Sequence, residues 1–417
     1  MTELSKEPGK ELGNAGRRRM LASTGGMMAW AGLGGIARAD TGAADPGAAA
    51  GPAAKPLPAY AGWKDADSMI VHSANTIETK RTAFGNGVIT PANRLFVRNN
   101  VAPPTDPALV KEPDSWTLEV SGVAEPRSFT VAELKTLGLA AVPMVLQCSG
   151  NGRNWFPHKP SGTQWTVGAA GCVIFTGVPV KAVLEAVGGM ADGMVYMTST
   201  GGEEIPAGLD PNTIKVERSV PISAIEDAIL AWELNGQPLP LAHGGPLRII
   251  VPGYTGVNSI KYIKHLAFTK EQSPAKIQQT SYRWTPVGGK PSPSDDAIWE
   301  MPVKSWINFP SDPDQTVQAG RVLISGVAMG GMTAAKTIEV SVNGGKDWQE
   351  AAFVGPDLGK YAWREFAFSA ELAPGTHELA CRATNEAGDT QPEERRENNR
   401  GYINNSWRDH MVVVKVA

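Results

Sequence analysis

Apolar and polar residues alternate along several short segments in the first two thirds of the chain. Residues 116–121 (Trp-Thr-Leu-Glu-Val-Ser) have the alternation of a half-buried strand, and the apolar runs 142–146 and 247–251 predict buried strands. Residues 130–137 begin with a capping box, Thr-Val-Ala-Glu, and predict a short helix. This mixture of elements predicts an α+β domain over residues 59–285.

The pattern changes after this domain. Residues 286–293 are rich in Pro, Gly and Ser, and we interpret 286–299 as a linker. Short strand-like segments then follow one another without helical patterns, and Asn343-Gly-Gly between two of them is a hairpin turn signal. This pattern favours an immunoglobulin-like β-sandwich domain over residues 300–417. Its predicted strands are 321–328, 337–342, 348–353, 363–369, 377–383 and 411–416.

The N-terminal residues have the pattern of an export signal. Three arginines at 17–19 precede a mildly apolar segment at 22–36, which is shorter than the roughly 20 residues that a membrane-spanning helix needs. Ala-Arg-Ala at 37–39 supplies a small-x-small cleavage pattern. Residues 1–39 therefore resemble a twin-arginine signal peptide and predict export to the periplasm. Residues 40–58, rich in Ala, Gly and Pro, are interpreted as a flexible linker.

Composition narrows the classes of function. The 417 residues contain 39 Lys and Arg against 42 Asp and Glu, so no excess of positive charge indicates a nucleic-acid partner. The three cysteines are widely spaced and form no Cys-x-x-Cys pair, which argues against a disulfide framework, a zinc ribbon or an attached c-type haem. Cys172 and Cys381 are predicted to be buried small apolar residues.

The third cysteine lies in a distinctive loop. Leu-Gln-Cys148-Ser-Gly-Asn-Gly-Arg153 places a thiol at the end of a predicted strand, in a glycine-rich turn, with an arginine five residues later. A nearby guanidinium favours the thiolate, which is the form that binds metals or acts as a nucleophile. From these residues alone, a metal ligand, a nucleophile and a buried structural cysteine all remain open.

This loop resembles the cysteine loop of the sulfite oxidase family, which reads Cys-(Ala/Ser/Thr)-Gly-Asn-x-Arg. Members of that family carry a molybdenum–molybdopterin cofactor, and the cysteine of the loop is the one protein ligand of the metal. By this resemblance Cys148 is the metal ligand, and Arg153 corresponds to the arginine at plus five. The resemblance also implies the sulfite-oxidase-type molybdopterin-binding fold for residues 59–285.

A second segment resembles the family's Phe-x-Arg-Asn-His. Here it reads Phe-Val-Arg98-Asn99-Asn100, which implies that Arg98 lies in the substrate pocket and that Asn99 and Asn100 contact the cofactor. Asn100 replaces the usual histidine. This difference changes the hydrogen bonding expected around the metal, and it leaves the substrate open.

Further segments match in the family's order. His243-Gly-Gly-Pro-Leu-Arg248 resembles His-Gly-x-Pro-x-Arg, and the loop that follows, with Ser259 and Lys261, resembles another cofactor contact. Gln-Gln-Thr-Ser-Tyr282 resembles Gln-Gln-x-x-Tyr, whose tyrosine faces the metal. The resemblance thus implies cofactor binding by His243, Arg248, Ser259 and Lys261, and a catalytic role for Tyr282.

The resemblance continues into the C-terminal part. Asn399-Arg400-Gly401 is similar to Asn-x-Arg-Gly, whose arginine reaches back into the substrate pocket, and residues 340–348 are similar to the family's dimerisation domain. Arg400 is therefore expected to join Arg98 and Arg153 around an oxyanion, since guanidinium groups bind oxyanions through paired hydrogen bonds. A homodimer is expected as well.

The activity implied is the oxidation of sulfite to sulfate by oxygen-atom transfer. With no haem segment expected in this chain, electrons are expected to pass to a separate c-type cytochrome, and no membrane span is expected. One alternative within the family is a sulfane dehydrogenase or a reductase of S-oxides, which Asn100 keeps open. Another alternative, of a different class, is a non-catalytic binding or adhesion protein, which predicts no molybdenum in the purified protein.

Overall fold

The structure is a computed structural model that describes residues 55–417 except 86 and 107. The predicted signal peptide (1–39) and nearly all of the predicted flexible linker (40–58) lie outside the described residues. Both therefore remain predictions.

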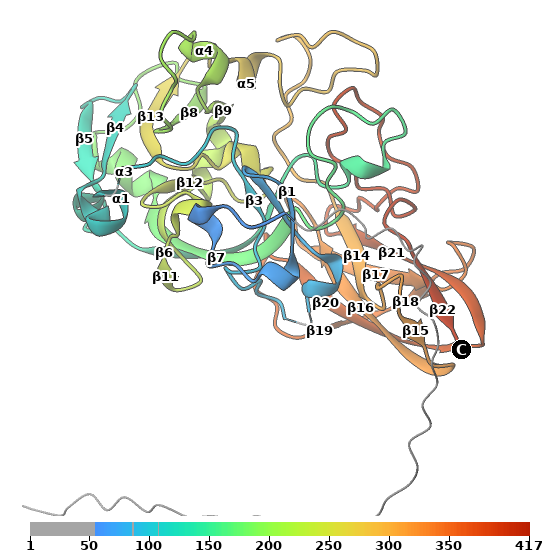
Figure 1. Cartoon of the computed structure of the whole chain (residues 1–417). Helices are drawn as coiled ribbons and strands as arrows, with labels where there is room; N and C mark the ends of the chain where they lie inside the picture. Colours follow the sequence, from blue (N-terminus) through green and yellow to red (C-terminus); the bar gives the residue numbers. More distant parts are fainter. Residues whose placement is uncertain (1–54, 86, 107) are drawn as a thin grey trace, which may run out of the picture. The chain divides into compact units, whose positions relative to one another are not determined.

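Three sheets make up the part that precedes residue 285 (Figure 1). The strand orders are β1-β2-β3, β11-β10-β7-β6 with β12 on β10, and β5-β4-β13-β8-β9. Their bounds are β1 Met69–Ser73, β2 Thr76–Thr79, β3 Val97–Arg98, β4 Thr117–Ser121, β5 Arg127–Thr130, β6 Ala140–Gln147, β7 Ala170–Pro179, β8 Tyr196–Gly201, β9 Glu217–Pro221, β10 Ile229–Leu234, β11 Gln237–Pro238, β12 Arg248–Ile250 and β13 Ile263–Thr269.

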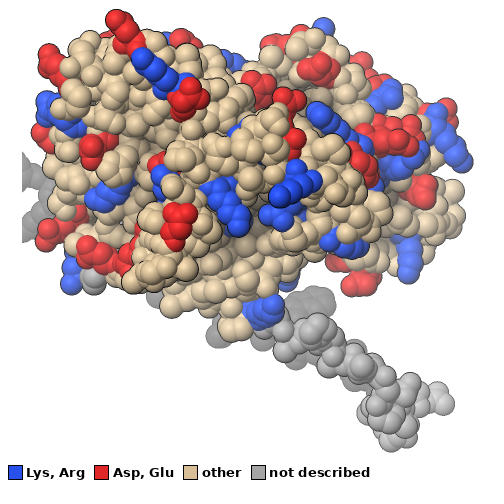
Figure 2. Space-filling view, turned by 90° about the horizontal axis from the view of Figure 1, so that it is seen from above, with Lys and Arg blue, Asp and Glu red and all other residues tan. Residues whose placement is uncertain are grey.

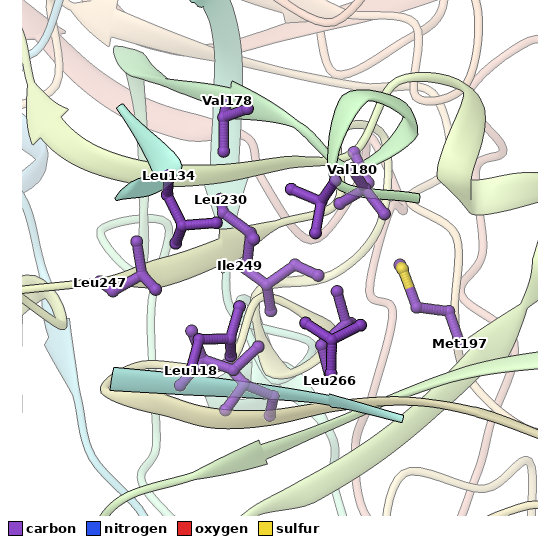
Figure 3. Close-up of a cluster of buried hydrophobic side chains, with 14 of the residues drawn as sticks. Leu118, Leu134, Val178, Val180, Met197, Leu230, Leu247, Ile249 and Leu266 are labelled. Carbon is purple, nitrogen blue, oxygen red and sulfur yellow. The ribbon is translucent and has the colours of Figure 1, made fainter. Parts of the chain in front are cut away.

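Alternation along the central strands gives the second of these sheets two buried faces. In β10, Leu230 belongs to one apolar cluster and Ala231 to another, because successive side chains of a strand point to opposite faces. The first cluster fills the space against β4, β8 and β13, where Leu118 and Leu266 face Leu230 (Figure 3). Burial on both faces holds the ends of β6 and β12 rigidly, and Cys148 follows directly after β6.

Two further sheets make up the C-terminal part, with orders β14-β16-β20-β19 and β15-β22-β21-β17-β18. Apolar side chains of both sheets, among them Ile324 and Ile338, form one common core, so the two sheets are packed layers. The finer assignment to the immunoglobulin class stays a prediction. The strands are β14 Lys304–Phe309, β15 Thr316–Val317, β16 Gly320–Met329, β17 Ala335–Ser341, β18 Gln349–Glu350, β19 Ala352–Val354, β20 Arg364–Leu372, β21 Gly375–Asn385 and β22 Val412–Val416.

Helices in the described part are few and short. They are α1 Ala108–Lys111, α2 Val131–Leu134, α3 Val180–Ala186, α4 Pro211–Ile214 and α5 Lys276–Gln279, so the fold is mixed but rich in sheet. None of the helices described is long and apolar enough to cross a membrane.

The strand predictions are confirmed, with one division, and the helix prediction is confirmed only in part. The segment 348–353 is split into β18 and β19 rather than forming one strand. The capping box of Thr130 and Glu133 is present, but α2 ends at Leu134, so the expectation of a helix through residue 137 was wrong. From Thr136 on, the backbone N–H groups bond three residues back, to Glu133 and Leu134, as in a turn, and Gly138 has a φ of 153°.

The two sheet systems belong to one compact unit. The Trp363 indole N–H donates to the Val88 carbonyl (2.7 Å), and the Val145 amide, in the strand that leads to the cysteine loop, donates to the Tyr361 carbonyl (2.8 Å). The C-terminal part thus supports the strand that carries Cys148. Acidic and basic side chains are interspersed on the face shown in Figure 2.

Candidate active site

All eleven residues singled out by the sequence motifs line two adjoining pockets. The first, which we call the chamber, has about 620 Å³ of empty space, part of it open to solvent, and is lined mostly by buried residues. The second, which we call the mouth, has about 1110 Å³ of empty space, part of it open to solvent, and includes exposed residues. The chamber contains Asn99, His243, Arg248, Ser259 and Lys261, the mouth contains Arg153 and Arg400, and both are lined by Arg98, Asn100, Cys148 and Tyr282.

Cys148 stands where the two pockets meet. Its backbone N–H donates to the Ala169 carbonyl (2.9 Å), which keeps the residue in line with β6, and its side chain is 7% exposed. The loop then turns at Gly152, whose φ of 90° is costly for any residue with a Cβ. A Cβ at Gly150 would lie 2.3 Å from the Arg153 guanidinium, so glycine there allows the arginine to fold over the loop.

The C-terminal part holds this cysteine loop from behind. Lys304, which is 1% exposed, and residues 400–404 supply the contacts. The hydrogen bonds are Lys304 Nζ to Asn151 Oδ1 (2.9 Å), Ile403 N to Ser149 O (2.8 Å), Asn404 Nδ2 to Gly152 O (2.9 Å) and Arg153 Nε to Arg400 O (2.8 Å). The loop that carries the thiol is therefore built jointly by both parts of the chain.

Lys261 lines the chamber and is hydrogen-bonded to two neighbouring segments of its wall. Its ammonium group donates to Asn99 Oδ1 and to the Ala242 carbonyl, both at 2.6 Å. Burial, followed by the nearby Arg248 and Lys64 charges, lowers its pKa well below the ordinary value, while Glu203 acts in the opposite direction. Asn99 thus fixes Lys261, and an anion in the chamber would favour its charged form.

His243 is buried against a second lysine that the motifs did not indicate. Lys64 Nζ donates to His243 Nε2 (3.0 Å) and to the Leu95 carbonyl (2.6 Å). Burial and the Lys64 and Lys261 charges lower the pKa of His243 well below 6.5, so the imidazole is neutral. Burial also lowers the pKa of Lys64 to about 7. The prediction placed His243 among the cofactor contacts, and the structure places it in the chamber wall with its Nε2 already engaged.

Arg248 ties the two chamber segments together. Its Nε donates to the Ser259 carbonyl (3.0 Å) and its Nη1 to the His243 carbonyl (2.9 Å). The Ser259 hydroxyl accepts the Val251 N–H (3.1 Å). Burial lowers the pKa of Arg248 to about 10, which leaves the guanidinium charged at neutral pH.

Arg98 and Asn100 form the border between chamber and mouth. Arg98 Nη2 donates to Asn100 Oδ1 (2.5 Å), and Nη1 donates to the Asn99 carbonyl. Burial acts to lower the pKa of Arg98, but Tyr282 and Cys148 outweigh it, so that the pKa is raised above its ordinary value. The amide of Asn100, in the position of the expected histidine, therefore serves as an acceptor that orients Arg98.

The two arginines that line only the mouth, Arg153 and Arg400, differ in exposure and in their hydrogen bonds. Arg153 is 7% exposed, and its Nη1 donates to the Thr163 carbonyl (2.9 Å), in addition to its bond with Arg400. Arg400 is partly exposed and donates through Nη1 to the Ser161 hydroxyl. Arg153 therefore holds the loop as well as lining the mouth, whereas Arg400 presents its charge toward the opening.

Three residues of the site were missed by the sequence motifs. Lys64 contacts His243 from 179 positions away, and Glu203, whose pKa is raised by burial to about 7, lines the chamber. Tyr402 lines the mouth. Only Tyr402 had a local signal, since it follows Arg400 by two positions.

One unpartnered oxygen in the chamber wall tests whether a polar group fits the site. Among the described residues, the buried Glu203 Oε2 has no hydrogen-bond partner, and Glu203 lines the chamber. Buried polar atoms are rarely left unpaired, so such an atom indicates a ligand or ordered water. One thiol, several cations and this oxygen in one chamber fit a polar, anionic cofactor bound to a metal.

Models of two known protein-domain families together match most of this chain. Residues 105–277 match the oxidoreductase molybdopterin binding domain, and residues 295–417 match the Mo-co oxidoreductase dimerisation domain. Arg98, Asn99, Asn100 and Tyr282 lie outside both matched ranges.

Individual proteins show the same similarity. Mitochondrial sulfite oxidase of Mus musculus is 30% identical over 84% of this chain and 67% of its own length. A nitrate reductase [NAD(P)H] of Hordeum vulgare is 30% identical over 81% of this chain and 40% of its own length. The structure of the sulfane dehydrogenase SoxCD from Paracoccus pantotrophus aligns with a TM-score of 0.70 and 24% identity, over 83% of this chain and 88% of that chain, and this similarity establishes the fold.

Proposed function

Because the chain belongs to the sulfite oxidase family of molybdopterin oxidoreductases, we propose that it oxidises sulfite to sulfate and transfers the electrons to a separate c-type cytochrome. The observation that carries this proposal is the position of Cys148, which lies where the cationic chamber meets an arginine-lined mouth. A cofactor in the chamber can therefore reach a small oxyanion in the mouth.

The cofactor of this chain is molybdenum–molybdopterin, which supplies the oxygen-atom transfer and the storage of two electrons when it is bound. The thiolate of Cys148 would be its metal ligand, since a soft sulfur donor suits a redox metal. Arg248 and Lys261 would bind its anionic end, because their charges are buried without a carboxylate hydrogen-bonded to them.

The residues of the mouth would bind and orient the substrate. Sulfite is a compact dianion near neutral pH, and Arg98 and Arg400 present guanidinium groups that match its oxygens. Tyr282 lines both pockets and would donate its hydroxyl proton in a hydrogen bond to the bound oxyanion. Charge built up in the transition state would be stabilised by these fixed donors without reorganisation of water.

A sulfane dehydrogenase is the second candidate, and one observation favours it. Exposed residues such as Asn100 and Ser161 border the mouth, so it opens to solvent, and a sulfur atom carried on another protein could approach Cys148 from that side. A narrow anion pocket would have favoured free sulfite alone. The two candidates therefore differ in the size of the sulfur substrate and not in the cofactor.

The test is the reduction of ferricytochrome c by purified protein whose molybdenum content has been measured. Rapid reduction that depends on sulfite supports the proposal. If protein with full molybdenum reduces no cytochrome with sulfite but does so with a protein-bound persulfide, the second candidate replaces the first. If the protein instead oxidises a reduced viologen dye when nitrate is added, both sulfur proposals fail.

We further propose that the protein is exported to the periplasm by the twin-arginine route and forms a homodimer. The arginines at 17–19 support the first proposal, and the match of residues 295–417 to a dimerisation domain supports the second. Replacing the three arginines by lysine should retain the protein in the cytoplasm, as cell fractionation would measure. Sedimentation that shows only monomer at micromolar concentration would contradict the dimer.

A further inference from the structure

Tyr402 lines the mouth but has no role in the proposed reaction so far. It is 4% exposed, and it shares this pocket with Cys148, Arg153 and Tyr282. It also belongs to a small apolar cluster with Tyr282. The residue comes from the C-terminal part of the chain, whereas Tyr282 follows α5.

The rings of Tyr282 and Tyr402 are stacked. Their centroids are 5.1 Å apart and their planes differ by 21°, which is within the range of attractive aromatic pairs. Guanidinium groups contact both rings: the carbon Cζ of Arg218 is 5.5 Å from the Tyr282 ring, and that of Arg153 is 5.3 Å from the Tyr402 ring. Such contacts are attractive because the ring face carries negative charge. The four side chains thus form one continuous series, in which Tyr282, Tyr402 and Arg153 line the mouth and Arg218 lies behind Tyr282 in the interior.

The backbone around each ring is held in a conformation that costs energy. Tyr282 has a φ of 53° and Ile403 a φ of 56°, and a β-branched residue in this region is a clear outlier. Hydrogen bonds keep both in place, because Ile298 N–H donates to the Tyr282 carbonyl and Ile403 N–H to the Ser149 carbonyl, each at 2.8 Å.

The main chain of Tyr402 is fixed as well. Its N–H donates to Asn398 Oδ1 (2.9 Å), and Asn398 Nδ2 donates to its carbonyl oxygen (2.8 Å). The main chain of Tyr402 is therefore held rigidly, and the hydrogen bond from Ile403 N–H to the Ser149 carbonyl fixes its position relative to the cysteine loop.

We propose that Tyr402 is a positioning residue that orients the phenol of Tyr282 toward the bound oxyanion. The proposal rests on the proposed function, in which Tyr282 donates a hydrogen bond to that oxyanion. Tyr402 acts through its aromatic ring, so phenylalanine can replace it. Its effect is on the orientation of Tyr282, so Arg98 and Arg400 can bind the anion without it.

The experiment compares Tyr402→Phe and Tyr402→Ala with the unchanged enzyme, using molybdenum-loaded protein. We expect Tyr402→Ala to lower kcat for sulfite about tenfold, the scale of one lost aromatic stack, because Tyr282 loses its support. We expect Tyr402→Phe to keep kcat within about twofold. In Tyr402→Ala, sulfate affinity, measured by calorimetry, should fall less than kcat, because Arg98 and Arg400 still bind the anion and only the hydrogen bond from Tyr282 is weakened.

The control is Trp348→Ala, which removes one ring of a different aromatic pair, that with Trp407 (centroids 5.0 Å apart), outside the two pockets. It should leave kcat within about twofold of the unchanged enzyme. Equal kcat for Tyr402→Ala and the unchanged enzyme would overturn the proposal. So would a parallel loss of sulfate affinity and kcat, which would indicate a general collapse of the mouth. An unchanged enzyme without sulfite activity would instead overturn the proposed function.

Discussion

The chamber and the mouth are both cationic, but their charges are held in different ways. In the chamber, Arg248 is buried and Lys261 is half-buried; both donate mainly to backbone carbonyls, and desolvation lowers the pKa of both. In the mouth, Arg98 has a raised pKa, and Arg400 is partly exposed and bonded to a serine hydroxyl. The difference indicates two kinds of ligand.

Buried charges without a counter-ion are costly, so the chamber gains most from an anion that enters once and stays. In the proposed reaction the mouth releases sulfate at each turnover, and partly exposed arginines bind an anion more weakly because water screens them. The chamber is therefore expected to control cofactor retention and the mouth to control substrate affinity.

The largest loss of activity should follow the replacement of Cys148, which lines both pockets. Replacing Cys148 by Ser should lower sulfite turnover by at least about a thousandfold, because a hydroxyl is a hard and weakly acidic donor in place of a thiolate. Turnover should be measured with the molybdenum content of the same sample. Substantial turnover in a variant that still contains molybdenum would show that Cys148 is not the metal ligand.

Removing a chamber cation should weaken cofactor binding. Replacing Lys261 by Met should reduce cofactor affinity by about 10- to 100-fold, since the lost charge supports the anionic end of the group. The molybdenum that remains after prolonged dialysis measures this effect. Lys264→Met is the matched control, because Lys264 lies three residues on and contacts Trp116 and Thr117 instead of the chamber. Equal molybdenum loss from both variants would contradict the assignment of the chamber.

Removing a mouth cation should act on the substrate and not on the cofactor. Replacing Arg98 by Met should raise KM for sulfite about tenfold or more, since a hydrogen bond to a charged group is worth about 1.5–3 kcal/mol. Molybdenum content should stay the same. The control is Arg94→Met, which breaks an ion pair with Asp65 outside the site. An unchanged KM in Arg98→Met would remove Arg98 from the substrate pocket.

The parts of this arrangement that could be predicted are those with a local signal. The strand at 116–121 was predicted because burial alternates along it, and the eleven motif residues were predicted because each lies in a short segment of recognisable order. Cys172 and Cys381 are buried, as predicted, and burial raises the pKa of each thiol to about 12. The length of α2 was not predictable from its first turn, because a capping box fixes a start and not an end.

The contacts that could not be predicted join distant segments. Lys304 reaches Asn151 across 153 positions, and Lys64 reaches His243 across 179. Neither lysine lies in a motif, and a lone lysine in a sequence is normally taken as solvated. Packing of the two sheet systems against each other places the Lys304 ammonium group in the interior, and the Tyr282–Tyr402 stack depends on the same packing. The Lys64 ammonium group is instead held between distant segments of the first part alone.

The smallest expected effect concerns Lys304, a buried lysine that donates a hydrogen bond to Asn151 in the cysteine loop, where chamber and mouth meet. Burial lowers its pKa to about 7, whereas an unfolded lysine titrates near 10.5. Between these values the unfolded state binds more protons, so the stability of the folded protein should rise as the pH increases from 7 toward 10.5. Below pH 7 both states are protonated, and the dependence disappears.

Replacing Lys304 by Met removes this titration. Between pH 6.5 and 9.5 the gain in unfolding free energy should be smaller in Lys304→Met than in the unchanged protein, by at most about 3 kcal/mol. Lys64, with a pKa lowered in the same direction, keeps part of the gain in both proteins. Denaturant midpoints at the two pH values measure the difference. Identical pH dependence in the two proteins would mean that Lys304 stays charged and paired, with Asp409 as the nearest source of compensation.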